Sequence, residues 1–113
     1  MNINKIISNA FKDSGITVLY SNRGDIKTFP LIVFHVMPEI IEDYNEGYIE
    51  KYVIYMNLYC SLNEVNTLRD KIIKIMRQNG FRLQQFGNAE TFNDKLGVAM
   101  INIPFYIITE KKY

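Results

Sequence analysis

The residues from Glu50 to Phe81 show the clearest pattern of hydrophobic and polar positions in the chain. The first part alternates between two kinds of side chain, which predicts a strand because successive side chains of a strand point to opposite faces. One set is apolar and suits a core: Tyr52, Ile54, Met56, Leu58 and Cys60. The other set mixes aromatic and polar groups: Lys51, Val53, Tyr55, Asn57 and Tyr59. A chain of 113 residues has little left to cover this second face, so we expect Tyr55 and Tyr59 to be exposed there and to contact a partner, such as another copy of the chain.

A helix is predicted directly after this strand. Ser61-Leu62-Asn63-Glu64 matches a capping box, in which the serine hydroxyl accepts a hydrogen bond from the Glu64 amide and the glutamate reaches back. The helix should run to about Asn79, with Gly80 ending it in a left-handed conformation and Phe81 folding back. Its apolar positions recur at helical spacing, which predicts a helix lying across a sheet. They are Leu62, Val65, Leu68, Ile72, Ile73, Ile75 and Met76.

The N-terminal part predicts one more helix and two strands. Residues 3–13 have apolar side chains at helical spacing, and Gly15 supplies a stop. A short β-branched strand is expected at Thr17–Tyr20, followed by a loop over residues 21–28. The apolar run from Pro30 to Met37 then predicts a buried strand, bounded by Pro30 and Pro38.

The remaining segments predict an acidic hairpin and a closing pair of strands. Residues 39–47 are acidic, join two strands and can extend them as a long hairpin. Residues 82–92 and 97–109 form the closing pair around Asn93-Asp94-Lys95, and residues 110–113 form a short polar tail. Pro104 lacks an amide donor and so marks an edge or a bulge. The last strand has an unbroken apolar face of Ala99, Ile101, Ile103, Phe105 and Ile107.

These elements predict a single α+β domain over residues 1–113. The order is α-β-β-β-α-β-β, with one mixed or antiparallel sheet of about four to five strands and two helices on one face. Hydrophobic content of 48% and charged content of 22% fit a globular domain of this kind.

Charge and cysteine content restrict the partners and the setting. A formal net charge of +1 gives no field that would attract nucleic acid or a membrane, so we expect neither partner. Cys60 is the only cysteine and cannot form an internal disulfide, which favours a reducing setting and a buried structural thiol. The apolar residues near the N-terminus are too few for a signal peptide, and no apolar run approaches the ~20 residues that span a bilayer.

Candidate chemistry is sparse, so we expect no enzyme, no catalytic residue, no cofactor and no metal. His35 is the only histidine and has no second histidine or cysteine pair with which to build a zinc site. Ser21 lacks the glycine setting of a nucleophile elbow. The acidic residues from Glu39 to Glu50 lack the spacing of a calcium loop. The tyrosines could stack on bases of single-stranded nucleic acid, but such platforms are set in a basic groove.

Arg69 is unusual because it projects within the apolar arc of the predicted helix. Its stem can lie at the rim of the arc with the charge in solvent, or the guanidinium can pair with an acid of a neighbouring subunit. The interface hypothesis therefore consists of Tyr55, Tyr59, Glu39, Glu42, Asp43, Glu46 and Arg69.

The element order resembles the tail terminator (tail completion) family of long-tailed, siphovirus-like bacteriophages. The resemblance lies in the short N-terminal helix, the strand beginning Phe29-Pro30, the acidic connection, the strand Tyr52–Tyr59, the serine-led helix ending Gly80-Phe81 and the final hairpin. It implies a non-enzymatic homo-hexameric ring that caps the tail tube and ends its polymerisation. The implied partners are other copies of the chain, the major tail tube protein and the head-completion (connector) protein. The implied location is the bacterial host cytoplasm during assembly and then the virion tail or neck.

An alternative from another class stays open. A small-molecule-binding α+β domain, or a small enzyme of unknown substrate, would place a pocket between the sheet and the helices.

Overall fold

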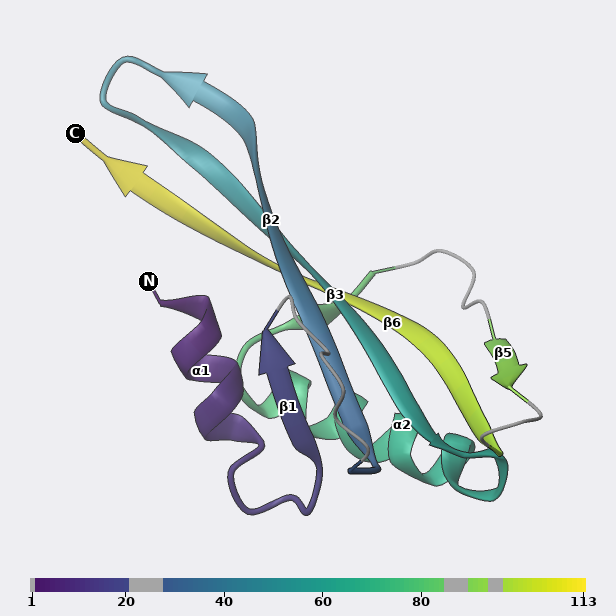
Figure 1. The fold of residues 1–113 in the computed structure, drawn as a ribbon. Coiled ribbons are helices and arrows are strands. Elements are labelled where there is room, and N and C mark those ends of the chain that lie inside the picture. Colours follow the sequence, from purple (N-terminus) through teal and green to yellow (C-terminus); the bar gives the residue numbers. More distant parts are fainter. Residues whose placement is uncertain (1, 21–27, 85–89, 94–96) are drawn as a thin grey trace.

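The structure, a computed structural model, describes residues 2–20, 28–84 and 97–113, and the backbone of residues 90–93. The predicted loop over 21–28 and the turn after Asn93 lie almost entirely outside these residues. In chain order the elements are α1 (Ile3–Ala10), β1 (Thr17–Tyr20), β2 (Leu31–Tyr44), β3 (Gly47–Ser61), a 3₁₀ turn η1 (Leu62–Glu64), α2 (Val65–Gln78), β4 (Arg82–Leu83), β5 (Glu90–Asn93) and β6 (Val98–Lys112) (Figure 1).

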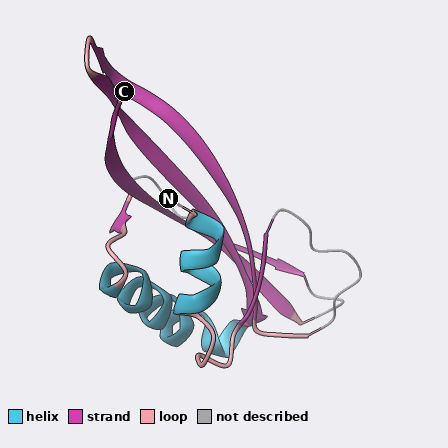
Figure 2. Ribbon diagram, turned by 90° about the vertical axis from the view of Figure 1, so that its left-hand side faces the viewer, coloured by secondary structure: helices cyan, strands magenta, loops and turns pink. Residues whose placement is uncertain are grey.

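One mixed sheet organises the molecule. The strand order is β1-β2-β3-β6-β4, and β5 pairs with β6 beside this path. β1 runs parallel to β2, and the other pairs are antiparallel. Both helices lie on the same side of the sheet (Figure 2). The predicted α+β class is therefore confirmed.

The core lies between the sheet and the helices. The predicted apolar face of β3 is buried from Ile54 to Cys60, and that of β6 from Ala99 to Phe105. α2 contributes Val65, Leu68, Ile72 and Met76. Leu62 is an exception, because it precedes α2 in the 3₁₀ turn and is 51% exposed.

The prediction for α2 is wrong at the N-terminal end of the helix and confirmed at its C-terminal end. The Ser61 hydroxyl donates to the Glu64 carboxylate at 2.6 Å instead of accepting from its amide, so the predicted capping-box geometry is wrong. The reason is that the first turn is a 3₁₀ turn, and the α-helix proper begins only at Val65. At the other end Gly80 has φ +90, and the Phe81 amide donates to the Met76 carbonyl at 3.1 Å, as predicted.

Two strands are longer than predicted. β2 continues through Pro38 to Tyr44, so the acidic connection is itself paired strand, closed by a tight turn at Asn45 and Glu46. β6 continues to Lys112, so the predicted polar tail is wrong. Pro38 is tolerated because β1 pairs with β2 only up to Phe34, which leaves the outer edge of β2 open at this point. The Pro104 carbonyl accepts from the Gln84 amide at 2.9 Å, so this residue's hydrogen-bonding side faces the short β4 and not β3.

The added length of β2, β3 and β6 forms a three-stranded arm, residues 37–53 and 106–112. The arm continues the sheet beyond the layer that the helices cover (Figure 1). It accounts for the elongated shape, with extents of 54 × 28 × 25 Å. The sequence pattern predicted the sheet but not how far it projects.

Candidate interaction surface

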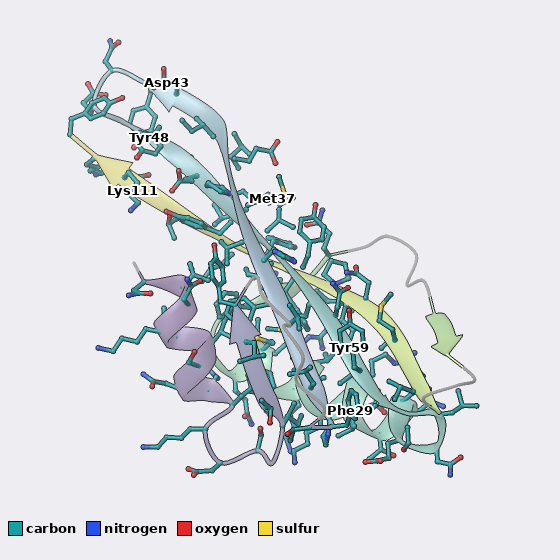
Figure 3. All side chains as sticks on the ribbon, in the orientation of Figure 1. Phe29, Met37, Asp43, Tyr48, Tyr59 and Lys111 are labelled. Carbon is teal, nitrogen blue, oxygen red and sulfur yellow. The ribbon has the colours of Figure 1, made fainter. Side chains whose placement is uncertain are left out.

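The outer face of the sheet is the side away from the helices. Strand register places its side chains in rows across β2, β3 and β6: Leu31–Tyr59–Met100, Val33–Asn57–Asn102, His35–Tyr55–Pro104 and Met37–Val53–Tyr106. Met37 and Tyr59 mark its length in Figure 3. The structure thus brings Tyr55 and Tyr59 to the sheet face that points away from the helices, as the alternation predicts.

Small and large side chains of the outer face differ in burial. Leu31, Val33 and Val53 are at most 6% exposed, whereas Met37 is 58% exposed. Tyr55 and Tyr59 are half-buried, so the prediction that they are exposed is wrong in degree. Neighbouring side chains in a cross-strand row lie close enough to cover one another, which shields the inner part of each ring.

Polar contacts stiffen the middle of the outer face. The Asn102 side-chain amide donates to the Asn57 oxygen at 2.9 Å across β3 and β6. The Lys51 ammonium lies 4.9 Å from the centre of the Tyr106 ring, at the base of the arm. His35 is exposed in the row of Tyr55 and Pro104 and does not lie in the core.

The arm carries four of the seven residues in the interface hypothesis. Glu39, Glu42 and Asp43 are exposed on β2, and Glu46 lies in the turn at the tip. Asp43 is labelled near this end in Figure 3. These acidic side chains therefore project from the body of the molecule on paired strands. A flexible connection would not hold them in that position.

Exposed apolar residues accompany the acids, and the sequence reasoning missed them. Ile40 is 60% exposed, Ile41 47% and Ile108 51%. A register shift between Ile40 and Glu42 leaves Ile41 as the extra residue of a β-bulge. An isoleucine pair inside an acidic segment is unusual for a solvated loop, and it was the signal that could have indicated a contact surface.

Arg69 lies apart from the acids within one chain. It sits on α2, on the helix side of the sheet, while the arm projects from the other end of the molecule (Figures 1 and 2). Its guanidinium donates to the Asn66 side chain at 3.2 Å. The structure therefore does not bring Arg69 together with the other members of the interface hypothesis, and pairing between subunits stays a prediction.

Tyr52 and Glu50 lie on the helix side of the arm. The pKa of Tyr52 is raised to about 12. The larger cause is a hydrogen bond to the Glu50 carboxylate, and the next is burial of the phenol. At the tip, the Tyr113 amide donates to the Glu46 carbonyl at 2.8 Å, and the rings of Tyr48 and Tyr113 lie 6.1 Å apart. The arm is thus held by specific contacts up to its end.

Two hollows lie on the helix side of the molecule. One, of about 590 Å³, lies where α1 begins, between it and the base of the arm, and is lined by Asn2, Ile3, Asn4, Tyr20, Val36, Pro38 and Tyr52. The other, of about 420 Å³, lies along α2 and is lined by Asp70, Ile73, Lys74, Arg77 and Gln78. Neither contains a histidine or a cysteine.

Among the described residues, no group of three or more histidine, cysteine or acidic side chains could hold a metal ion. Within the same part of the chain, no helix has the length and apolar character to cross a membrane. Cys60 is buried, at 1% exposure.

The chain matches no protein-family model and no curated protein sequence.

Proposed function

We propose that this chain is a structural phage or prophage protein that caps the tail tube as a ring, ends tail polymerisation and forms the head–tail joining surface. One observation carries the proposal: the sheet extends beyond the layer that its own helices cover. Among the described residues, the arm projects with exposed acidic and isoleucine side chains that can contact other molecules. The element order, which resembles that of tail terminators, supplies the identity of those molecules.

The chemistry of the uncovered surface supports an assembly role. Half-buried tyrosines on the outer face and exposed isoleucines on the arm offer large apolar area at fixed positions. Tyrosine is enriched at the centres of protein interfaces. A surface of this kind suits a stable contact between proteins better than a catalytic site, for which the sequence offers no nucleophile or acid–base pair.

The proposed partners follow from this role. They are further copies of the chain in a hexameric ring, the major tail tube protein on one side and the head-completion protein on the other. No cofactor is needed, and the net charge of +1 gives no reason to expect direct binding of nucleic acid.

Gene removal tests the proposal. In the phage that encodes this chain, loss of the gene should give tails of irregular length that fail to join heads, and the wild-type chain supplied in trans should restore normal particles. Electron microscopy of the lysate measures both tail length and head attachment. Normal infectious particles without the gene would contradict the proposal.

One hollow favours the alternative function, which is that of a small-molecule-binding domain. The 590 Å³ hollow beside α1 has both apolar and polar lining groups, as ligand sites do. It lies at the base of the arm, however, where a protein contact would also fill it, so the assembly role accounts for more of the surface.

A further inference from the structure

The arm and the helices carry opposite charge. The arm, residues 37–53 and 106–112, has six acidic and three basic side chains, a net charge of −3. The helical segments, residues 2–14 and 62–79, have six basic and three acidic side chains, a net charge of +3. The small total charge of the chain therefore conceals two regions of opposite sign.

On the arm, charge and apolar surface occur together in five consecutive residues. In the segment Glu39–Asp43, two exposed isoleucines stand between acidic side chains. The β-bulge at Ile41 turns successive side chains of this segment in different directions. The segment therefore combines exposed apolar and acidic side chains on one short part of the arm, and interfaces between proteins use both kinds of group.

α2 presents the complementary pattern on its outer side. Lys74 and Arg77 are exposed and line the 420 Å³ hollow, with the half-buried Ile73 as its apolar part. Asp70 also lines the hollow, so its rim has two basic groups and one acidic group. Lys71 is engaged inside the chain, since its ammonium donates to the Ser14 carbonyl at 2.7 Å.

These two surfaces cannot meet within one chain. The acidic segment lies on the projecting arm, and α2 lies against the opposite end of the sheet (Figures 1 and 2). β3 and β6 are paired without a register shift from the core to the tip of the arm, so the arm cannot fold back onto α2. Complementary surfaces at opposite ends of one molecule fit a contact between two copies.

We propose that the Glu39–Asp43 segment of one copy docks on the Ile73–Arg77 surface of α2 in a second copy. The contact is head-to-tail, because it joins two different surfaces. Repeated by rotation it closes a ring, and repeated without closure it gives a filament. The proposal names the intersubunit contact of the proposed tail-terminator ring and rests on that function for its biological setting.

Pairing through the open edge of β2 would use the same segment in another way, but the strand carries features that oppose it. Pro38 has no amide donor, the bulge interrupts the ladder, and acidic side chains follow along the edge. All three are devices that keep edge strands from adding another strand. The side chains of the segment, and not its backbone, are therefore the part that docks.

A two-variant mixing experiment tests the contact. The first variant, Glu42→Lys with Asp43→Lys, makes the arm basic, and the second, Lys74→Glu with Arg77→Glu, makes α2 acidic. Each variant alone places like charges at every contact and should stay monomeric by light scattering at concentrations at which the wild type associates. An equimolar mixture restores opposite charges at both kinds of contact, arm of the first on α2 of the second and the reverse, and should associate again.

Matched controls and opposing outcomes complete the test. Lys5→Glu with Lys12→Glu changes the charge of the N-terminal segment by the same amount as the α2 variant and should leave association unchanged. Added salt should weaken wild-type association. A wild type that stays monomeric at all concentrations, or a mixture that stays monomeric, overturns the contact. Neither outcome affects tail capping as measured by gene removal, so the two proposals fail separately.

Discussion

Tyr52 is a residue whose ionisation is opposed by its surroundings. It lies on the helix side of the arm, in the row of Pro38 and Ile107, and its hydroxyl is hydrogen-bonded to Glu50. The nearby carboxylate opposes formation of a second negative charge, so the pKa of Tyr52 rises to about 12. The folded arm therefore favours the protonated phenol.

This shift gives a pH prediction with a definite sign. The pKa of Tyr52 is higher in the folded state than its ordinary value of 10.0, so the contribution to stability is complete below pH 10 and is lost as the pH rises towards about 12. Glu50→Gln should lower the pKa of Tyr52 towards 10.0 and reduce this alkaline loss. Titration of the Tyr52 ring by NMR measures the pKa, and urea unfolding at several pH values measures the stability. An unchanged pKa in the Glu50→Gln variant would show that the hydrogen bond is not the cause.

Gly47 gives a second prediction at this scale. It is the first residue of β3, paired with Tyr44 across the turn, and a Cβ atom there would collide with the backbone carbonyl of Lys111. Gly47→Ala should therefore push β3 and β6 apart at the tip. Hydrogen exchange should become faster for amides of the arm, while those of the core strands stay protected. Equal acceleration in the arm and the core would mean that the arm is not a separate unit of stability.

At the scale of elements, α2 is the principal cover of the sheet. Ile72 lies on the inner side of α2 and is fully buried. Leu62, ten positions earlier in the predicted apolar arc, is 51% exposed. A comparison of the two residues therefore distinguishes the stability that core packing contributes from the stability that apolar character alone contributes.

Truncation of these two residues should have very different effects. Ile72→Ala should lower the free energy of unfolding by about 2–5 kcal/mol, because it removes buried methyl groups and leaves a cavity. Leu62→Ala should change it by no more than about 0.5 kcal/mol, the usual range for an exposed position. Denaturant unfolding monitored by circular dichroism compares them with the parent chain. Similar losses in both variants would mean that the packing face of α2 is assigned incorrectly.

The elements that could be predicted from sequence are those with a regular pattern of their own. The alternation from Tyr52 to Cys60 indicated which side chains of β3 face the core, and the helical spacing from Val65 to Met76 indicated the buried side of α2. The outer parts of β2 and β6 lack such a pattern, since charged residues occur on both of their faces. They are strands because they pair with β3, and local sequence does not contain that long-range information. For the interface hypothesis, the face of Tyr55 and Tyr59 was predicted correctly, and the acidic residues extend β2 and β3 as the long hairpin that the sequence pattern allowed.

At the scale of the whole molecule, the outer face and the arm differ in shape and chemistry, although they share the row Met37–Val53–Tyr106. The outer face is broad, aromatic and stiffened by the Asn57–Asn102 hydrogen bond. The arm is narrow, acidic and projecting. A protein with two distinct surfaces can bind copies of itself through one and other components through the other.

The outer face should be required for assembly with other tail components. Tyr55→Ala with Tyr59→Ala removes two of the three tyrosine rings in its rows, and aromatic residues at interface centres contribute most to binding. The double variant should remain folded by circular dichroism but should fail to restore normal tails in a strain that lacks the gene. Leu62→Ala, a truncation at a 51% exposed position in the 3₁₀ turn and not on the outer face, serves as the control. Normal particles from a folded double variant would rule out the aromatic rows as the binding surface.

The unbroken pairing of β3 with β6 has a mechanical consequence. Fifteen consecutive residue pairs, from Gly47 with Lys112 to Ser61 with Val98, join the tip of the arm to the core without a register shift. A ladder of this kind contains no hinge, so the arm should move as a rigid extension of the core. The twist of the sheet sets its direction. The only irregularity is the bulge in β2 near the tip, where bending would be concentrated. A partner that binds the arm would then have to adjust to the direction of the arm. In a ring, the direction of the arm in the folded monomer would therefore determine the angle between successive subunits.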